Sequence, residues 1–277
     1  MGGCAPWQRA PPLVAAGAGE RVRVLHVYKN YFPESQGGVE ETIRQICRGT
    51  TAHGVTNTVL TLSRARAARV LERDEATVVR YRQDLEIASC GMSISALLAF
   101  AERAGAADIV HYHYPWPFAD LMHLLRRVRT PSVVTYHSDI VRQRRLMRFY
   151  APLMRRFFGR VDSIVATSPN YFASSELLQE FAEKVEVIPI GTDGETCVAS
   201  DADAPAALAD QIGSNFFLFL GVLRYYKGLH VLLEAVAGTE LPVVIAGAGP
   251  AEPELKAHAE RLGLDNVRFL GYVADAE

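Results

Sequence analysis

The sequence predicts an α/β protein of two parallel, doubly wound domains, of which the second is incomplete. From Arg21 onward, short β-branched runs alternate with stretches of helical periodicity, a pattern typical of β-α-β units with right-handed crossovers. The composition changes between Gly191 and Ser214, where alanine and aspartate accumulate, and a shorter alternation follows. This change predicts a domain boundary, which we place between residues 195 and 196.

The first predicted domain covers residues 21–195. Its first strand is the apolar run Val22–Val27, and a helix is expected after the next loop, where Val39, Ile43 and Ile46 recur at helical spacing. Further strands are expected at Asn57–Leu62, Val78–Tyr81, Asp108–Tyr112, Ser132–Tyr136, Ser163–Thr167 and Lys184–Ile188. Helices are expected between most of them, notably at Ile94–Arg103, Phe118–Arg127 and Tyr171–Phe181.

The second predicted domain covers residues 196–277. Its expected strands and helices, in chain order, are Phe216–Leu220, Leu229–Ala237, Val243–Ala246, Glu254–Leu262 and Val267–Leu270. Three strands are half of the about six that a doubly wound sheet usually has. Such a half-sheet would leave an edge strand and apolar faces uncovered. The sequence therefore predicts a truncated second domain.

Composition narrows the class of protein. Hydrophobic residues make up 49% and charged residues 22% of the chain, which fits a folded globular protein. The net charge of −2 gives no positive excess that would indicate a nucleic-acid partner. No apolar stretch reaches the roughly 20 residues that a membrane-spanning helix needs. The four cysteines form no C-x-x-C pair, which fits a reducing compartment and predicts a cytoplasmic protein.

The first 20 residues are interpreted separately. They are rich in glycine, alanine and proline, and their apolar run from Leu13 to Ala16 is too short for the core of a signal peptide. We expect residues 1–20 to form a disordered leader.

Gly37 and Gly38 end the first strand-loop and precede a helix. Glycine lets a ligand approach the backbone, and a helix N-terminus offers free N–H groups to an anion. An ordinary pair of loop glycines is the alternative. The chain has neither G-x-x-x-x-G-K-[ST] nor G-x-G-x-x-G, so a P-loop is excluded and ordinary dinucleotide binding is disfavoured.

The run from Gly221 to Gly228, G-V-L-R-Y-Y-K-G, follows the first strand of the second domain. It would hold Arg224 and Lys227 at the carboxyl end of a parallel sheet, where ligands of such folds bind. A guanidinium can grip a phosphate with two parallel bonds, and an ammonium adds a point charge. A solvated basic turn is the alternative.

Taken in order, the motifs resemble those of the retaining glycosyltransferases of family 4. These motifs are G-G-V-E, T-Y-H-S-D, A-T-S, P-I-G-T-D, G-V-L-R-Y-Y-K-G, I-A-G-A-G-P and F-L-G-Y, spread over residues 21–277. The resemblance implies the GT-B fold, in which two facing Rossmann-like domains hold a nucleotide-sugar donor. It also implies transfer of a hexose, with retention of configuration and without a metal cofactor, to a glycan or lipid-linked acceptor. A bacterial mannosyl- or rhamnosyltransferase of surface polysaccharide assembly is the nearest type.

The resemblance also implies roles for individual residues of the first domain. Gly37 and Gly38 would lie near the donor diphosphate and the sugar or acceptor. His137 would contact the donor sugar, with Asp139 just beyond it. Ser168, together with Gly191, Thr192 and Asp193, would line the cleft between the domains.

In the second domain, Arg224 and Lys227 would bind the diphosphate, while Gly247, Gly249 and Pro250 would shape the nucleotide side of the cleft. Two departures from the family pattern bear on these roles. Val222 stands where the family commonly has arginine, so the role of Arg224 is less secure than that of Lys227. The acidic E-x-F-G-x-x-x-x-E motif is absent, so we expect this chain to bind a donor poorly and to be inactive alone.

Two other functions stay open at this point. A non-catalytic protein or remnant that binds nucleotide sugars would keep the same motifs, and a nucleotide-sugar epimerase can have a similar two-domain fold. An epimerase needs no acceptor, so product analysis with and without an acceptor separates it from a transferase.

His111 and His113 alternate along one expected strand and should therefore point to the same face. With His137 they could imitate three zinc ligands. We favour a structural or substrate-contacting role that lines a polar cleft, with no metal.

The segment Arg142–Arg160 contains seven arginines among apolar and aromatic residues, and Pro152 is expected to kink or divide its helix. Such a helix can lie on anionic lipid at the inner face of a membrane. We favour the alternative, in which its apolar side packs on the domain core and its basic side is solvated.

Overall fold

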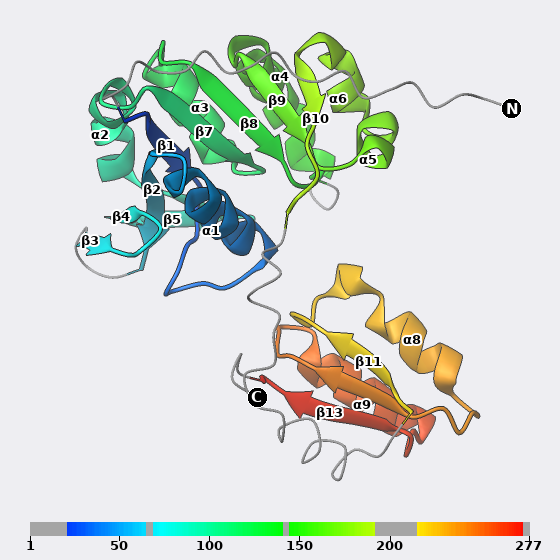
Figure 1. The fold of residues 1–277 in the computed structure, drawn as a ribbon. Coiled ribbons are helices and arrows are strands. Elements are labelled where there is room, and N and C mark those ends of the chain that lie inside the picture. The colour runs from blue at the N-terminus through cyan, green and yellow to red at the C-terminus, as the bar shows by residue number, and fades with distance from the viewer. Residues whose placement is uncertain (1–20, 65–68, 141–143, 192–214, 274–277) are drawn as a thin grey trace, which may run out of the picture. The chain divides into compact units, whose positions relative to one another are not determined.

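The computed structural model describes residues 21–64, 69–140, 144–191 and 215–273. They belong to two compact units, Met1–Thr192 and Asp193–Glu277 (Figure 1). The expected leader, residues 1–20, and the expected domain boundary between residues 195 and 196 lie outside the described residues and stay predictions. Each unit is described by itself below.

An eight-stranded sheet forms the centre of the first unit. Its strands are β1 (Arg23–Val27), β2 (Thr56–Ser63), β3 (Arg69–Glu72), β4 (Thr77–Arg82), β7 (Ile109–Tyr114), β8 (Ser132–Tyr136), β9 (Ser163–Ala166) and β10 (Val185–Val187). They lie in the order β10-β9-β8-β7-β1-β2-β4-β3, and only β3 pairs antiparallel with its neighbour. The direction of winding reverses at β1, whose neighbours are β2 and β7. In such sheets the carboxyl ends of the strands at this switch point form the usual ligand site.

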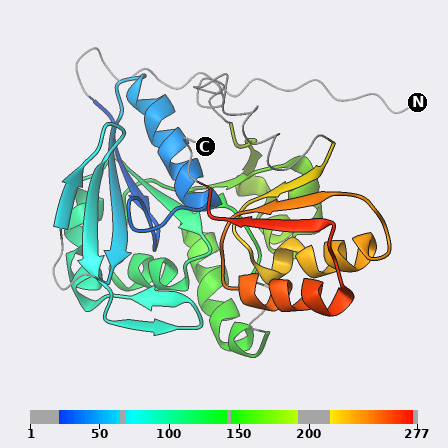
Figure 2. The ribbon, with the colours of Figure 1, turned by 90° about the horizontal axis from the view of Figure 1, so that it is seen from below.

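Helices cover both faces of this sheet. The helix α1 (Gly38–Thr51) lies on one face, and α2 (Ile94–Gly105), α3 (Pro117–Leu125) and α4 (Arg144–Arg160) lie on the other (Figures 1 and 2). Ile43 and Cys47 of α1 are buried in one apolar cluster with residues of β2 and β4. A larger cluster on the opposite face contains the fully buried Phe100, Met122 and Phe157. Strand residues therefore alternate between two cores.

Some local structure differs from the sequence prediction. The strand β3 and the hairpin of β5 (Leu85–Ile87) and β6 (Cys90–Met92) were not predicted. Their strands have only three or four residues, which is too short for a clear period. The helix expected at Tyr171–Phe181 is divided into α5 (Pro169–Ser174), α6 (Glu176–Glu180) and the 3-10 turn η1 (Ala182–Lys184), because Ser175 between the two α-helices has an extended backbone.

The helix α4 continues through Pro152, so this proline does not divide it, and the alternative of a kink stays a prediction. Pro152 has no N–H with which to bond the carbonyl of Arg148 one turn earlier. Both residues are exposed, so water can satisfy that carbonyl. The cost of the proline is thereby reduced on this side of the helix.

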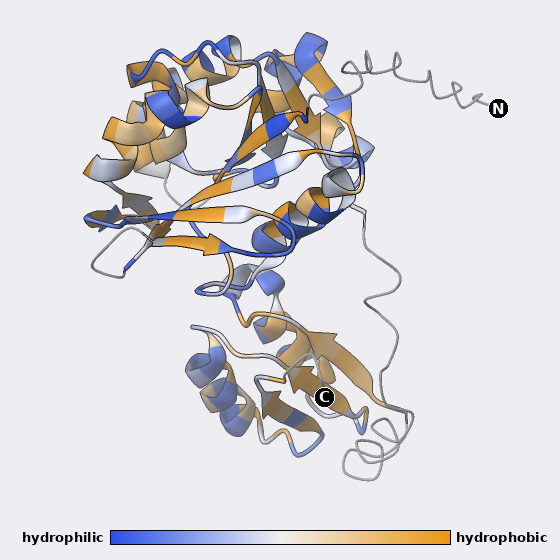
Figure 3. Cartoon of the chain, turned by 60° about the vertical axis from the view of Figure 1, so that its left-hand side comes forward, coloured by the Kyte–Doolittle hydropathy of each residue, from blue (hydrophilic) through white to orange (hydrophobic). Residues whose placement is uncertain are grey.

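The second unit has a three-stranded parallel sheet in the order β11-β12-β13. Its elements are β11 (Phe217–Leu220), η3 (Tyr225–Lys227), α8 (Leu229–Val236), β12 (Val243–Ala246), α9 (Glu252–Leu262) and β13 (Val267–Gly271). Both helices share one apolar cluster with alternate strand residues, such as Ile245, so they cover the same face (Figure 2). Leu218 and Leu220 alternate with the clustered Phe219 and are 58% and 71% exposed. The strands are mostly hydrophobic, with Arg268 of β13 as the charged exception (Figure 3).

No helix within the described ranges is both long enough and apolar enough to cross a membrane.

Phe157 and Phe149 provide a matched test of the packing of α4. The ring of Phe157 is fully buried against Tyr112, His123 and Phe158, whereas Phe149 is 85% exposed. We expect Phe157→Ala to lower the free energy of unfolding by about 3–5 kcal/mol, because it leaves a cavity in the core. Phe149→Ala should change it by less than about 0.5 kcal/mol. Urea unfolding of both variants measures the difference, and equal losses would show that the helix packs otherwise.

Candidate functional site

Four histidines lie close together on one face of the larger sheet. His26 comes from β1, His111 and His113 from β7, and His137 directly follows β8. The parallel register pairs His26 with His111. The ring centroids of His111 and His113 are 4.4 Å apart, and those of His113 and His137 are 5.4 Å apart. The prediction that His111 and His113 share a face is therefore confirmed.

Hydrogen bonds join three of these rings in a line across four neighbouring strands. The side-chain oxygen of Asn57, on β2, lies 3.2 Å from Nε2 of His26. Nδ1 of His26 lies 3.2 Å from Nε2 of His113, and Nδ1 of His113 lies 3.1 Å from Nε2 of His137. His111 is outside this line, since its Nε2 bonds the hydroxyl of Thr135 at 2.7 Å.

Burial keeps these imidazoles neutral at pH 7. Removal from water lowers the pKa of His26 to about 4, against a smaller opposing effect of its bond to Asn57. Burial also lowers the pKa of His137 to about 4. The pKa values of His111 and His113 lie well below the usual value, first because of burial and then because of repulsion by neighbouring imidazoles. A neutral imidazole has one N–H donor and one acceptor nitrogen.

His26, His111 and His113 are also near enough to one another to bind a metal ion, since one nitrogen of each lies within 4.8 Å of the others. The sequence had suggested His111, His113 and His137 for such a set, so His26 takes the place of His137. No carboxylate or thiolate joins this group among the residues that the structure describes. Such an ion would be held by three neutral imidazoles alone, which is a ligand set that zinc accepts. The metal-free interpretation stays a prediction.

Asp139 and Ser168 both form hydrogen bonds with Tyr171 beside the end of β8. The hydroxyl of Tyr171 donates to a carboxylate oxygen of Asp139 at 2.9 Å, and Tyr136 donates to the other oxygen at 2.6 Å. Ser168 caps α5 by accepting the backbone N–H of Tyr171 at 3.1 Å. These contacts give both residues a structural role, and their predicted roles toward a ligand stay predictions.

Gly37 is the N-cap of α1 and Gly38 its first residue. The φ of Gly37 is −162°, which any residue adopts, and a Cβ atom on Gly38 would meet nothing within 4 Å. Backbone geometry and packing therefore do not explain the choice of glycine at residue 38. The predicted role of Gly37 and Gly38 beside a ligand stays a prediction.

The first turn of α1 also carries Glu40 and Glu41. Glu40 is buried, and its carboxylate accepts the hydroxyl of Ser35 at 2.7 Å. Negative side chains already occupy the positive end of the helix dipole. This helix end is consequently better suited to hydroxyl groups than to a diphosphate.

In the second unit, two glycine loops meet at the carboxyl ends of β11 and β12. Gly221 donates its N–H to the carbonyl of Ala246 at 3.0 Å, and Leu223 donates to that of Ala248 at 3.1 Å. A Cβ atom on Gly247 would lie 2.0 Å from the oxygen of Gly221, and one on Gly249 would lie 2.4 Å from that of Leu223. Close packing of the two loops therefore explains both glycines without a ligand.

Arg224 and Lys227 project from the first of these loops. The N–H of Lys227 donates to the carbonyl of Arg224 at 3.0 Å and closes a 3-10 turn, which places two exposed cations within one turn. Gly228 then enters α8 with φ +72°, a left-handed conformation that favours glycine. The predicted position of both cations at the carboxyl end of β11 is found.

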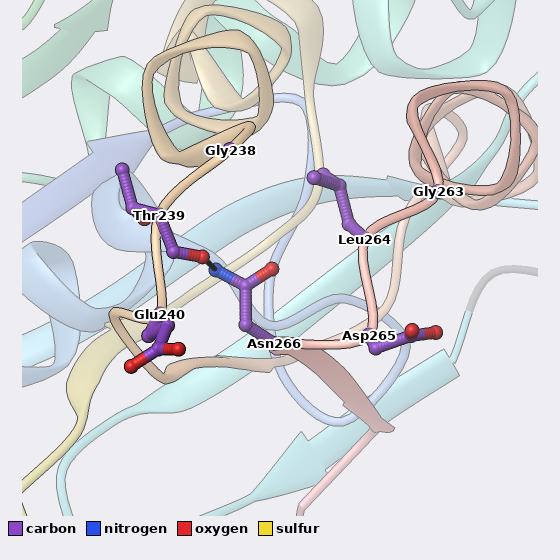
Figure 4. A pocket seen from close by; sticks show the side chains of 7 residues that line it. All are labelled: Gly238, Thr239, Glu240, Gly263, Leu264, Asp265 and Asn266. Carbon is purple, nitrogen blue, oxygen red and sulfur yellow. Dashed lines mark hydrogen bonds between the residues drawn. The ribbon is translucent and has the colours of Figure 1, made fainter.

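A hollow of about 430 Å³ lies in the second unit between the turns before β12 and β13 (Figure 4). Asn266 closes one side, because its side-chain amide donates to the backbone oxygens of Thr239 and Leu241 at 3.1 and 2.9 Å. Both turns precede strands, so this hollow lies at the amino ends of the strands, whereas the glycine loops lie at the carboxyl ends. Ligands of such folds bind at the carboxyl ends, and we assign the hollow a structural role.

Comparison with known proteins decides the family. The sequence model of the protein family described as Glycosyltransferase Family 4 matches residues 36–196, which is more than half of the chain. The family model described as Glycosyl transferases group 1 matches residues 202–277. The chain belongs to glycosyltransferase family 4. This family 4 chain is 50% identical over 256 residues to a D-rhamnosyltransferase, WbpZ, of Pseudomonas aeruginosa. The match covers 92% of the chain and 67% of that relative.

Other relatives agree with this assignment. An O-antigen chain mannosyltransferase of Escherichia coli is 44% identical, with 92% of the family 4 chain and 69% of that relative covered. Among solved structures, sucrose-phosphate synthase from Thermosynechococcus elongatus has a TM-score of 0.71 at 19% identity, covering 92% of this chain and 72% of its own. The lipopolysaccharide glycosyltransferase WaaG has a TM-score of 0.62 at 17% identity, covering 91% and 70%.

The predictions of the glycosyltransferase family and of the GT-B class of fold, with Rossmann-like domains, are thus confirmed. The roles of individual residues stay predictions. Gly191 is exposed with open space around it, whereas Thr192 and Asp193 lie outside the described residues.

Sequence reasoning missed His26 and Asn57. A signal was present for His26, a polar residue between the buried, apolar Leu25 and Val27, whereas Asn57 stands between two threonines and gave none. The residue that each would bond was not visible from the sequence, because it lies on another strand.

The family 4 chain should lose stability as the pH falls from 6.5 toward 4. In this window the unfolded chain binds protons on imidazoles that the folded chain keeps neutral, so the free energy of unfolding falls with falling pH. The buried residues concerned are His26, His111, His113, His123 and His137. Asp120 opposes them, because burial raises its pKa to about 7 and the folded state keeps its proton.

Each proton taken up only on unfolding contributes about 1.4 kcal/mol per pH unit. Because five imidazoles outnumber one carboxyl, urea unfolding at pH 7 and pH 5 should give the lower stability at pH 5. Equal or higher stability at pH 5 would contradict the neutral histidine cluster.

Proposed function

We propose that this chain belongs to an enzyme that moves a hexose from a nucleotide-diphosphate sugar to a glycan or lipid-linked acceptor, with retention of configuration, in polysaccharide biosynthesis. The observation that carries the proposal is the 50% identity to a D-rhamnosyltransferase. A mannosyltransferase at 44% identity supports the same sugar class, because D-rhamnose is the 6-deoxy form of D-mannose. We therefore infer a donor sugar of the manno configuration.

A nucleotide-sugar donor is supported by the charges of the second unit. Arg224 and Lys227 are exposed within one turn at the carboxyl end of β11. When the bond from the sugar to the diphosphate breaks, negative charge grows on the leaving oxygen. Fixed cations stabilise this charge and lower the barrier without binding the neutral sugar more tightly. The solved structure of HepE from Anabaena, a fold neighbour with a TM-score of 0.67 at 18% identity, holds UDP-glucose.

The donor sugar is assigned to His137 and the acceptor or sugar to the backbone at Gly37 and Gly38. His137 is neutral and carries no positive charge toward a phosphate. The two acidic residues in the first turn of α1 likewise disfavour a diphosphate there. We propose that the chemistry needs no metal ion, since the two cations of the glycine loop supply the positive charge that a leaving diphosphate requires.

Lys227 gives the direct test. We expect Lys227→Ala to weaken binding of ADP, GDP or UDP, whichever the chain prefers, by about 10–100-fold, because a charge-assisted bond to phosphate is lost. Lys256→Ala is the control, since Lys256 pairs with Glu252 on α9. Titration calorimetry with the three nucleotides measures both variants. Unchanged affinity in Lys227→Ala would remove this residue from the site.

Turnover separates the rival functions. Release of nucleoside diphosphate that depends on an added acceptor supports transfer, while interconversion of the sugar without any acceptor indicates an epimerase. Donor turnover by this chain would exclude a non-catalytic nucleotide-sugar-binding protein, and it would also contradict the expectation that the chain is inactive alone.

Contact with a membrane is a second proposal, carried by the exposed side of α4. Phe149 is 85% and Leu146 is 49% exposed beside Arg148, while the buried Met154, Phe157 and Phe158 hold the rest of the helix on the core. The predicted packing of the helix is thus found, and an apolar and basic surface also remains outside. Such a surface suits the anionic inner face of a membrane, where a lipid-linked acceptor would lie. A cytoplasmic location belongs to this proposal.

Vesicles test it. We expect the chain to bind phosphatidylglycerol vesicles in flotation assays, less so as salt increases, because salt screens the attraction. Replacing Arg142, Arg144, Arg145 and Arg148 by Glu should abolish this binding. Arg261→Glu, on α9, is the control and should retain it. Absence of binding by the unmodified chain at low salt would refute the membrane contact.

A further inference from the structure

We propose that Asn57, acting through His26 and His113, fixes the tautomer of His137 so that Nδ1 of His137 always faces a ligand as a hydrogen-bond acceptor. Asn57, His26 and His113 are therefore positioning residues. The assignment of His137 to the donor sugar rests on the proposed function, whereas the tautomer follows from contacts inside the first unit.

The orientation of Asn57 is the starting point. Its side-chain nitrogen lies 3.0 Å from the backbone oxygen of Cys47 and 3.1 Å from the hydroxyl of Thr51. A carbonyl oxygen only accepts hydrogen bonds, so the amide nitrogen must be on that side. The side-chain oxygen of Asn57 then faces Nε2 of His26 at 3.2 Å. Asn57 is 4% exposed, and a reversed amide would bury two facing oxygens.

The donor and acceptor roles of each imidazole are fixed by those of the ring before it. An oxygen acceptor at Nε2 makes that nitrogen of His26 the donor, so its Nδ1 becomes the acceptor. His113 must then donate from Nε2 to Nδ1 of His26 over 3.2 Å, which leaves its own Nδ1 as an acceptor. His137 donates from Nε2 to that atom over 3.1 Å. Three neutral rings thus hold their N–H groups on Nε2 in sequence.

We call this hydrogen-bonded row of Asn57, His26, His113 and His137 the relay. It requires neutral imidazole rings, because a protonated imidazole donates from both nitrogens and accepts from none. His26 and His113 are 1% exposed, and burial disfavours the charged form. The rings are nearly parallel, with interplanar angles of 24° for His26 and His113 and 23° for His113 and His137. Each ring is therefore held in the geometry that passes the direction on.

At the end of the row, the fixed tautomer makes Nδ1 of His137 selective for a hydroxyl group over a phosphate oxygen. Nδ1 of His137 makes no hydrogen bond to another residue that the structure describes. A lone pair at this atom accepts from a hydroxyl group and repels a phosphate oxygen, which itself only accepts. Under the proposed function, His137 would thus bind a sugar hydroxyl and help to keep the diphosphate on the cations of the second unit. The opposite tautomer would present an N–H, which both a hydroxyl and a phosphate oxygen can accept, and the selectivity would be lost.

Nitrogen-15 NMR of the histidine-labelled chain tests the relay without any donor. In the unmodified chain at pH 7.5, we expect Nδ1 of His137 to show the resonance of an unprotonated imidazole nitrogen and Nε2 that of an N–H. His26→Phe should remove the acceptor for His113 and give His137 a mixture of tautomers. His26→Gln should restore the original tautomer, since an amide can donate to Asn57 and accept from His113.

His123→Phe is the matched control. His123 is another buried histidine of the same unit, bonded to the hydroxyl of Tyr112 at 2.9 Å and outside the row. This variant should leave the His137 resonances unchanged. Two-dimensional amide spectra of all variants show whether they are folded, and His26→Gln keeps the test valid where His26→Phe does not fold.

Three results would overturn the relay. They are an N–H on Nδ1 of His137 in the unmodified chain, the same single tautomer in folded His26→Phe, or one bound metal ion per chain by elemental analysis that is lost in His26→Gln. None of them depends on a nucleotide sugar. An unchanged nucleotide affinity in Lys227→Ala would instead contradict the proposed role of Lys227, and it would leave the tautomer result intact.

Discussion

The parallel pairing of β1 with both β2 and β7 is the constraint on which the rest of the first unit depends. It places His26 beside His111 on one side and beside Val59, two residues after Asn57, on the other. Because side chains two apart on a strand share a face, Asn57, His26 and His113 then meet on that face. β1 is also where the winding of the sheet reverses, and the polar row runs from Asn57 near the amino end of β2 to His137, directly after the carboxyl end of β8. Only the His137 end of the row therefore lies where ligands of such sheets usually bind.

A polar row inside a sheet is stable only when nearly every buried atom has a partner. An unpaired buried polar group costs roughly 1–3 kcal/mol, which exceeds the net gain of about 1 kcal/mol from one hydrogen bond. The row meets this demand by passing donor and acceptor roles along in a fixed direction, from an asparagine held by the backbone of α1. The rigid arrangement that protects the fold is the same arrangement that presents one nitrogen of His137 in a defined state.

The second unit positions its chemistry by a different means. Two loops after neighbouring strands pack backbone against backbone, which only glycine allows at Gly247 and Gly249. This packing supports the turn that carries Arg224 and Lys227. Glycines in this family motif therefore act here by holding a neighbouring loop. Under the proposed function, the exposed cations of this turn would face the donor diphosphate, and the neutral His137 of the first unit would face the sugar.

The sequence by itself determined the α/β class, most helices and strands, and the family, because hydrophobic period and ordered motifs are local properties of the chain. It also placed His111, His113 and His137 near strand ends, where parallel strands bring ligand-binding side chains together. It could not reveal β3, the β5–β6 hairpin or the break at Ser175, whose segments are too short for a period. Only the tertiary structure added His26 and Asn57 to the site and divided the glycines into packed and open ones. Hydrogen bonds between strands far apart in the chain and the close backbone packing of two loops depend on register, which no local pattern in the sequence encodes.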